Sequence, residues 1–431
     1  MPTTSEDYVI RRFAPVAKNE PGYDAAVAWT HAVTFGFHDE RRTEERVDRG
    51  LQMSVADGRM FTGAYQTGEP APHSLPAEIP VATFGTMRNS LNIGFGRLLE
   101  AHLVTAVTVR TSHRRRGLLR RMMSEDLALA KKDGLAIAAL TASEASIYGR
   151  FGFGVATSEQ NIRVDTSRRF RINHTPLGTV DVADPKVLLD LAPEVFAKMH
   201  ANLPGSVGRQ DYYRQVASGS VGDEDGAPDA KVKAALHYSA DGTVDGYVSY
   251  KFAGWDKTPA TMEIVDLVAA NPAAYLELWQ YLGAIDLVDR VTWENTAVDN
   301  PLTWALEDPR CIAAADSRDM LWLRILDVRK ALEERYFPTD GRLTLKLRDA
   351  LGLAGGTFTL VVDSGSAAVA ESVTAPDLEM DISTLSSLYL GGASAASLMA
   401  AGRIQENTAG AGFLLTRMFA VERPAFCQTH F

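Results

Sequence analysis

Residues 107–134 constrain the fold of this chain more than any other stretch. Residues 107–109, Val-Thr-Val, form a short apolar segment of the kind found in buried strands, and a turn rich in arginine follows before Gly117. From residue 118 to residue 132 apolar side chains recur at helical spacing, and Gly134 is typical of the left-handed residue that ends a helix. The pattern predicts a strand, a basic glycine turn and a helix in direct succession.

The basic turn predicts a binding site for a pyrophosphate. Arg114, Arg115 and Arg116 precede Gly117, and Arg120 lies one helical turn later. Guanidinium groups bind phosphate oxygens through charge-assisted hydrogen bonds. The first backbone N–H groups of a helix are unpaired and lie at the positive end of its dipole. Because glycine also lets a ligand approach the backbone closely, the turn suits a pyrophosphate group.

A second motif, Glu144-Ala-Ser-Ile-Tyr148-Gly-Arg-Phe-Gly-Phe153, follows the helix and the next expected strand. Together with the basic turn, and in this order, it resembles the signature of the GCN5-related N-acetyltransferases, the GNAT superfamily. In that superfamily the turn holds the pyrophosphate of acetyl-CoA. Two positions depart from the superfamily pattern, since Leu119 stands where Gly or Ala is usual and Glu144 where Ala is usual.

A narrower resemblance accounts for the second departure. The run Arg-Arg-Arg-Gly-Leu-Leu-Arg and the pair Ser143-Glu144, just ahead of Ile147-Tyr148, are similar to the Eis-type (enhanced intracellular survival) acetyltransferases. The plan of the whole chain and the terminal Phe431 agree with that family. The resemblance implies an α+β fold with α/β-like mixed sheets, in which tandem GNAT domains are followed by a sterol-carrier-protein-like C-terminal domain.

A length of 431 residues suggests about three domains on its own. The resemblance implies that residues 1–165 form the catalytic GNAT domain with the acetyl-CoA site. Residues 166–326 are then a second GNAT-like domain without the cofactor loop. Residues 327–431 are the sterol-carrier-protein-like domain that supplies the C-terminal carboxylate.

Hydrophobic periodicity predicts the remaining elements of the first domain. An edge strand is expected first, then an amphipathic helix, a pair of strands joined by a proline-rich loop, and the strands on either side of the motif helix. The expected strands are residues 7–13, 59–65, 81–87, 99–109, 135–140 and 151–157, the helix is residues 23–35, and the loop is residues 68–80.

The middle of the chain repeats this plan without the basic turn. Residues 232–252 predict a hairpin around an Asp-Gly turn, and a strand at 262–268 precedes a helix at 273–282. The turn between these two elements, residues 269–272, reads Ala-Ala-Asn-Pro and contains neither glycine nor arginine. It cannot hold a pyrophosphate in the same way. The acidic run 218–229 predicts a solvated loop rather than a calcium site.

The composition changes from residue 327 onward. Helices are expected at residues 328–336, 381–389 and 393–401, and strands at 341–347 and 356–362. This order resembles a sterol-carrier-protein-like domain. Four apolar residues of the short helices are expected in the core, with the lining of a lipid cavity as the alternative: Leu388, Leu390, Leu398 and Met399.

Composition argues against several classes of protein. With a net charge of −10 the chain is not expected to bind nucleic acid. Solubility alone explains an acidic balance of this size, and a cationic substrate is the alternative explanation. No apolar run reaches about 18 residues, so no membrane-spanning helix is expected. Two cysteines, Cys311 and Cys427, are too few for a disulfide framework and are expected to be packing residues. The nine histidines show no ligand spacing, so no metal site is expected.

The family resemblance assigns the catalytic roles. It implies that Tyr148 is the general acid that protonates the departing CoA thiolate, and a phenol with a pKa of about 10 is protonated at neutral pH. The alternative is a core tyrosine. The resemblance also implies that the terminal carboxylate of Phe431 is the base that takes the amine proton. His430, beside it, could relay a proton or contact the acceptor.

The expected acetyl-CoA-binding residues are Val107, Thr108, Val109, Arg114, Arg115, Arg116, Gly117, Leu118, Leu119, Arg120, Ser143 and Glu144, with the N–H of Val109 polarising the thioester carbonyl.

The acceptor wall is expected just after the first helix, where GNAT domains usually contact the acceptor. Phe37, His38 and Asp39 lie there, and Phe84 and His430 are further candidates. The alternative is that the aromatic residues belong to the core and that the acidic residues form a solvated turn. The sequence leaves both open.

The resemblance therefore implies an acetyl-CoA-dependent N-acetyltransferase. Its acceptors would be amines of polycationic small molecules such as aminoglycosides, or lysine side chains of proteins and peptides. Acetyl-CoA as cosubstrate indicates a cytoplasmic enzyme, and the family implies a homohexamer. A hypothesis of another class is a protein that senses acetyl-CoA without turnover and carries a lipid in its last domain.

Overall fold

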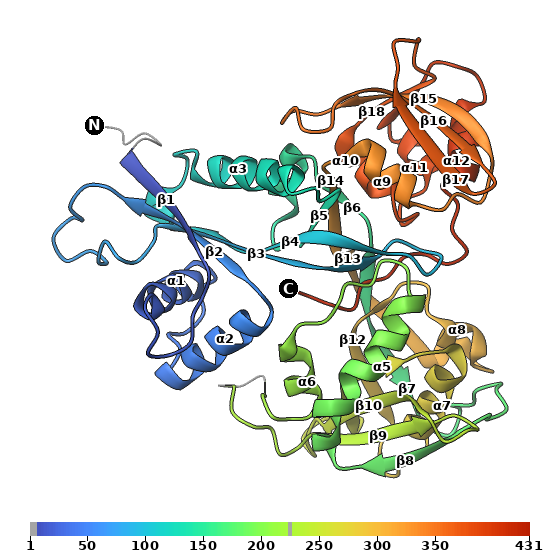
Figure 1. The fold of residues 1–431 in the computed structure, drawn as a ribbon. Coiled ribbons are helices and arrows are strands. Elements are labelled where there is room, and N and C mark those ends of the chain that lie inside the picture. The colour runs from blue at the N-terminus through green and yellow to red at the C-terminus, as the bar shows by residue number, and fades with distance from the viewer. Residues whose placement is uncertain (1–6, 223–225) are drawn as a thin grey trace.

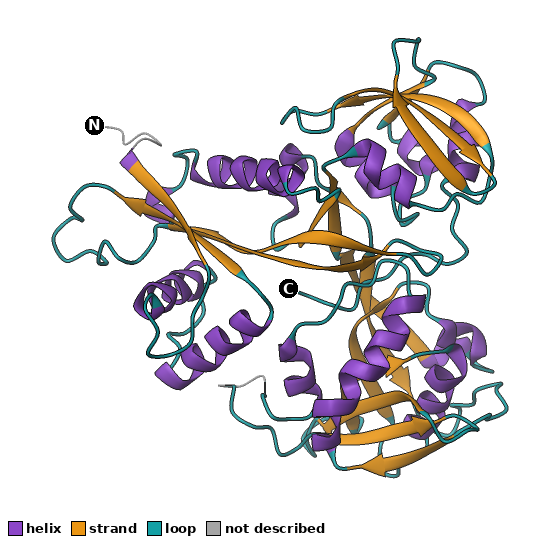
Figure 2. Ribbon diagram, in the orientation of Figure 1, coloured by secondary structure: helices purple, strands orange, loops and turns teal. Residues whose placement is uncertain are grey.

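The computed structural model describes residues 7–222 and 226–431 as three β-sheets covered by helices (Figures 1 and 2). The first sheet has the strand order β1-β2-β3-β4-β5-β14-β6, and the second has the order β13-β7-β12-β11-β10-β9-β8. The third sheet has the order β17-β16-β15-β18-β19. The acidic run expected to be a solvated loop includes residues 223–225, which lie outside the described residues.

The first sheet lies between two helical layers. Helix α3 covers one face, and α1 and α2 cover the other (Figure 1). The expected edge strand, the antiparallel pair β2–β3 and the helix after the basic turn are confirmed. The elements of this part are β1 (Tyr8–Phe13), α1 (Tyr23–Gly36), α2 (Glu44–Ala56), β2 (Met60–Gln66), β3 (Ala82–Asn92), β4 (Leu98–Val109), α3 (Leu118–Lys132), β5 (Ile137–Thr141), α4 (Ala145–Tyr148) and β6 (Gly154–Val155).

The second sheet repeats the order of the first. Its hairpin β9–β10 and its strand–helix pair β11–α7 lie where the sequence predicts them. The elements are β7 (Ser158–Asp165), β8 (Thr179–Ala183), α5 (Leu188–Asn202), α6 (Asp211–Ala217), β9 (Lys233–Tyr238), β10 (Val244–Phe252), β11 (Thr261–Ala269), α7 (Pro272–Gly283), β12 (Arg290–Ala297), α8 (Pro301–Ala305), β13 (Ile312–Asp319) and β14 (Leu321–Ile325).

The two sheets exchange one strand each. Strand β7 follows the first unit in the chain but pairs with β12 and β13 of the second sheet. Strand β14 follows the second unit but pairs with β5 and β6 of the first sheet. Of the strand expected at residues 151–157, only the two residues of β6 form a strand. Residues 149–151 form a 3₁₀ turn instead, and Gly152 has a positive φ of 84°. The expected domain boundary at 165/166 therefore falls after a strand that belongs to the second sheet.

The third unit packs against the first sheet. Its helix α10 contacts β14 and β6, and the hydrophobic core runs continuously from the first sheet into the third. Leu388 and Leu390 are buried in this core, and Leu398 and Met399 pack against it. The elements are α9 (Val328–Glu334), β15 (Gly341–Arg348), β16 (Gly356–Asp363), β17 (Ser366–Glu371), β18 (Leu378–Asp381), α10 (Ile382–Leu388), α11 (Ala395–Ala400), β19 (Ile404–Glu406) and α12 (Ala411–Met418).

A buried ion pair joins the first and third units. Arg324 of β14 donates to the Asp349 carboxylate at 2.6 Å, and both side chains are at most 1% exposed. The same carboxylate accepts the backbone N–H groups of Leu353 and Ala354. Burial on its own would raise the pKa of Asp349, but the charge of Arg324 and these hydrogen bonds lower it overall. The contribution of this carboxylate to stability is therefore present above about pH 4 and is lost as the pH falls through the lowered pKa.

We expect Asp349→Ala to destabilise the protein strongly. The substitution leaves the Arg324 guanidinium buried without its partner, which typically costs about 3–5 kcal/mol. Chemical denaturation measures the loss. The matched control is Asp381→Ala, which removes a surface ion pair with Arg348 at 2.9 Å and should cost no more than about 1 kcal/mol. Equal effects of the two substitutions would contradict this account of the interface.

Candidate active site

The centre of the first sheet opens into a cleft. Strand β4 pairs in parallel with β5 only from His102 to Val104, although β4 continues to Val109. The N–H of Arg110 donates to the carbonyl of Val81, directly before β3. Because successive residues of a strand point their N–H groups to opposite edges, the N–H of Val109 points away from β3. The strands thus splay apart beyond Val104, and free backbone groups face the gap.

One end of this gap is lined by the basic turn. A cavity of about 480 Å³ is bounded by residues 113–120 together with Val109, Glu144 and Arg150. Gly117 has a φ of 76° at the N-cap of α3, and this left-handed conformation favours glycine. The turn brings together the arginines, the glycine and the helix N-terminus that the sequence predicts for a pyrophosphate, so the residues present fit acetyl-CoA.

We expect Arg115→Ala to weaken acetyl-CoA binding. Arg115 is exposed in the turn and lines the cavity, and a hydrogen bond to a charged group contributes about 1.5–3 kcal/mol. The KM for acetyl-CoA should rise by about tenfold or more while kcat changes little, and the difference should shrink at high salt. The control is Arg88→Ala, which removes a surface arginine paired with Asp133. An unchanged KM in Arg115→Ala would contradict the assignment of this turn.

The other end of the gap is a second cavity of about 460 Å³ that meets all three units. Residues of β4, of the segment after β5 and of the C-terminus line it, and the C-terminus lies below β4 near the centre of the view in Figure 1. Its lining residues are Phe37, Val104, Thr105, Ala106, Val107, Thr141, Ala142, Ser143, Tyr148, Glu159, Arg318, Asp319, Met320, His430 and Phe431. We call it the acceptor cavity.

Tyr148 ends helix α4 and is held with its ring buried, at 6% exposure. Burial is the main reason that the pKa of its hydroxyl is raised, and the negative charge of Glu144 raises it further, against a smaller opposing effect of a hydrogen bond with Ser143. The hydroxyl therefore stays protonated throughout the neutral range. It can donate a proton into the cavity that it lines.

The C-terminal residue, Phe431, also lines the acceptor cavity. The hydroxyl of Thr141 donates to the terminal oxygen of Phe431 at 3.2 Å. The preceding residue, His430, contacts Glu159 through Nε2 at 3.1 Å. The terminus thus lies at the end of β5 and close to β7, between the first two sheets.

Glu159 is a carboxylate that the sequence analysis missed. Its side chain is 2% exposed and accepts from Arg318 Nε at 2.8 Å. Burial would raise the pKa of Glu159, but the hydrogen bonds and charges of His430 and Arg318 lower it overall. The acceptor cavity is lined by the three acidic residues Glu159, Asp319 and the C-terminal Phe431, beside the guanidinium of Arg318 and the imidazole of His430. This balance favours a cationic ligand.

The expected acceptor residues are divided between several places. Phe37 and His430 line the acceptor cavity, whereas Asp39 lines a separate cavity beside α1 and residues 75–81. His38 is exposed and has a φ of 64°. Phe84 does not line the acceptor cavity, because its ring is fully buried in the core.

The expected cofactor residues are arranged along the gap. Val107 and Ser143 line the acceptor cavity, while Val109, the residues from Arg114 to Arg120 and Glu144 line the basic cavity. Thr108 is buried, and its hydroxyl lies 2.7 Å from that of Thr83.

Three further features concern metal binding, membrane spanning and the two cysteines. Within residues 7–222 and 226–431 no cluster of three or more His, Cys, Asp or Glu side chains could hold a metal ion. No helix in the described part of the chain is long and apolar enough to cross a membrane. Both cysteines are buried, and burial raises the pKa of the Cys427 thiol to about 12, as befits a packing residue.

Comparisons with known proteins agree with this geometry. Two acetyltransferase (GNAT) domain families match residues 26–156 and 205–325, and a sterol carrier protein domain family matches residues 328–428. An uncharacterized N-acetyltransferase of Streptomyces griseus is 35% identical over 94% of this chain and 96% of its own length. The N-acetyltransferase Eis of Mycobacterium tuberculosis is 32% identical over 69% of this chain and 73% of its own length.

A solved structure agrees over the full length. The crystal structure of Eis1 from Mycobacterium abscessus superposes with a TM-score of 0.81 at 25% identity, and the match covers 98% of this chain and all of that one. The expected architecture of two GNAT domains followed by a sterol-carrier-protein domain is confirmed, and the GNAT fold implies acetyl-CoA as cosubstrate. The chain belongs to the Eis family of GNAT N-acetyltransferases.

Proposed function

We propose that this enzyme acetylates amines of polycationic small molecules, such as aminoglycosides, with Tyr148 as general acid and the terminal carboxylate of Phe431 as general base. One observation carries the proposal: a protonated phenol and the C-terminus line a single cavity in the splay between β4 and β5. The excess of carboxylates in that cavity supports a cationic acceptor. A cytoplasmic homohexamer, as the family resemblance implies, belongs to the same proposal.

The chemistry assigns each group one proton. Acetyl-CoA supplies the acetyl group and a thiolate leaving group when bound. An aliphatic amine with a pKa of about 10 arrives as an ammonium ion, and the Phe431 carboxylate takes its proton. The free nitrogen then forms a bond to the acetyl carbon while the carbon–sulfur bond breaks. Tyr148 gives its proton to the departing sulfur, and the acetylated nitrogen returns its second proton to the Tyr148 phenolate. The products are a neutral amide and the CoA thiol, and the Phe431 carboxylic acid gives the first proton to water.

Positioning of the two reactants supplies the rest of the rate enhancement. The basic turn would hold the pyrophosphate, and the free backbone groups of residues 105–109 would align the pantetheine arm. The N–H of Val109 would polarise the thioester carbonyl, because preorganised donors stabilise charge that develops on oxygen. Holding both reactants in one cavity makes the transfer effectively unimolecular.

Release of CoA thiol from acetyl-CoA tests the function. Aminoglycosides, linear polyamines, simple monoamines and lysine peptides are supplied in turn, and the acetylated products are identified by mass spectrometry. We expect turnover with the polycationic small molecules and weak turnover with monoamines. Turnover confined to lysine peptides would replace the acceptor class with proteins. Binding of acetyl-CoA without turnover on any amine would contradict the proposal and favour a sensor.

A further inference from the structure

The second domain has a splay of its own, and the C-terminal segment of the chain lies along it. Strand β11 pairs in parallel with β12 only from Thr261 to Glu263, although it continues to Ala269. This is the arrangement of β4 and β5 in the first domain. The side-chain amide of Gln428 donates to the carbonyl of Leu267 at 3.0 Å, within the part of β11 that is not paired with β12.

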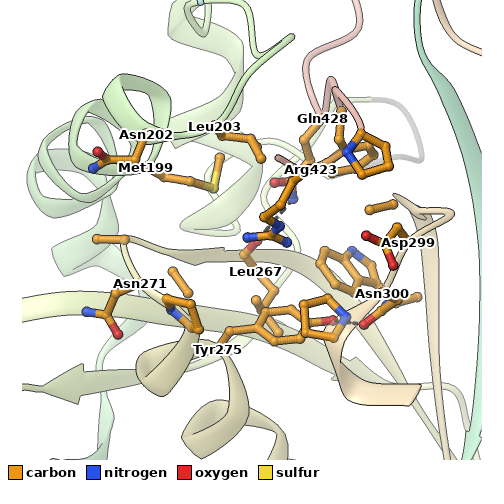
Figure 3. A pocket seen from close by; sticks show the side chains of 18 residues that line it. Met199, Asn202, Leu203, Leu267, Asn271, Tyr275, Asp299, Asn300, Arg423 and Gln428 are labelled. Carbon is orange, nitrogen blue, oxygen red and sulfur yellow. Dashed lines mark hydrogen bonds between the residues drawn. The ribbon is translucent and has the colours of Figure 1, made fainter. Parts of the chain in front are cut away.

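Beside this contact, a small cavity is the part of the splay that the C-terminal segment leaves open. It measures about 180 Å³ and is bounded by α5, the β11–α7 turn, β12 and residues 423–428 of the C-terminal segment (Figure 3). Figure 3 shows Gln428 and Arg423 on the side of this cavity opposite Asn271 and Tyr275. The chain itself therefore occupies much of the place where a GNAT domain would align a pantetheine arm.

Further contacts fix the segment up to its last residue. The N–H of Phe426 donates to Pro204 at 2.8 Å, and the hydroxyl of Thr429 donates to Val207 at 2.8 Å. Residues Ala425 to Thr429 are all buried. A C-terminus usually frays, so a buried, hydrogen-bonded terminus needs such contacts to stay in place.

His430 is held at its backbone and at its side chain. The Tyr213 hydroxyl accepts the His430 N–H at 2.6 Å and lies 3.2 Å from the His430 carbonyl, to which it donates. The imidazole Nε2 lies 3.1 Å from the Glu159 carboxylate. These contacts hold the residue directly before Phe431, which carries the terminal carboxylate.

Tyr213 is itself rigidly supported. Its ring packs on the guanidinium of Arg209, with 4.5 Å from Cζ to the ring centroid, and the ring of Phe196 contacts the same guanidinium at 4.6 Å. Arg209 is bound in bidentate fashion by Asp266 of β11 at 2.6 and 2.8 Å. The anchor of the C-terminus is thus built into the strand that borders the second splay.

We propose that the second domain acts as the receptor for the chain's own C-terminal segment, and that Tyr213 and Glu159 are positioning residues that fix the terminal carboxylate through His430. The inference rests on the proposed role of that carboxylate as base. It gives the domain without a cofactor loop a part in catalysis: its splay binds the segment that carries the base to the first domain.

Two substitutions test the anchor. Tyr213→Phe keeps the ring on Arg209 and removes both hydrogen bonds to His430, while Glu159→Gln keeps a polar side chain and removes the charge. Tyr238→Phe, in β9 near the edge of the second sheet, is the control. We expect kcat for the amine to fall by about tenfold to a hundredfold in the two test variants, because a small misplacement of a reacting group costs that much. The KM for acetyl-CoA and the thermal midpoint should stay close to those of the control.

A second readout does not depend on the chemistry. Carboxypeptidase A removes a C-terminal phenylalanine only when the segment is released, and intact mass spectrometry follows the loss. We expect release of Phe431 to be about tenfold faster in Tyr213→Phe than in the control, in line with the loss of two hydrogen bonds. Equal release rates together with an unchanged kcat would overturn the inference. If instead the wild-type terminus is protected but blocking it leaves turnover intact, the anchor stands and the assignment of the base fails.

Discussion

Replacing Tyr148 with phenylalanine should lower kcat by about a hundredfold to ten-thousandfold, the range that general acid catalysis contributes. The substitution removes one oxygen from a buried side chain and leaves the ring packed near Phe153, so the fold should be preserved. The departing thiolate then lacks the proton that the Tyr148 hydroxyl would give it. The measurement is the steady-state rate of CoA thiol release at saturating acetyl-CoA and amine.

Acetyl-CoA binding separates this effect from damage to the site. The dissociation constant of acetyl-CoA should be nearly unchanged in Tyr148→Phe, because the arginine turn lies in the other cavity of the gap. Tyr65→Phe is a matched control, since Tyr65 is also buried in the first domain and does not line the acceptor cavity. Full activity of Tyr148→Phe would show that another group, or water, protonates the sulfur.

Blocking the C-terminal carboxylate should have an effect of similar size. An extension of a few residues past Phe431 moves the terminal charge away from Phe431 and adds chain at the acceptor cavity that Phe431 lines. A Phe431 carboxamide, made by peptide ligation, removes the charge without adding length. We expect either change to lower kcat by about a hundredfold or more, since a general base contributes about 10²–10⁴.

The same peptide placed at the N-terminus is the control for the extension. That change should leave the rate at the wild-type value, because β1 lies at the outer edge of the first sheet. If the carboxamide and the extended protein both turn over at the wild-type rate, the base is another group, and Glu159 in the same cavity becomes the first candidate.

The strand, basic turn and helix of residues 107–132 could be predicted because their pattern is local. Helical spacing, the arginines and Gly117 all lie within a few turns of one another, and the structure has α3 at Leu118–Lys132. The repeat of the plan in the middle of the chain was visible for the same reason. Its strand β11 and helix α7 follow the same hydrophobic periods.

The exchange of strands and the anchor of the C-terminus could not be predicted from the sequence alone. Both depend on contacts between distant residues: Glu159 and His430 are 271 positions apart, and Tyr213 and His430 are 217 apart. Nothing in the neighbourhood of Glu159 distinguishes it from an ordinary polar strand residue. Phe84 shows a different limit of prediction from sequence. An aromatic residue in a central strand is equally compatible with a contact to the acceptor and with a place in the core.

A crystal structure with CoA and a polycationic amine tests the central claim most directly. The account predicts the CoA sulfur in the splay between β4 and β5, within about 3–3.5 Å of the Tyr148 hydroxyl, and an amine nitrogen within hydrogen-bonding distance of the Phe431 carboxylate. A sulfur atom far from Tyr148, or an amine bound away from the C-terminus, would contradict it.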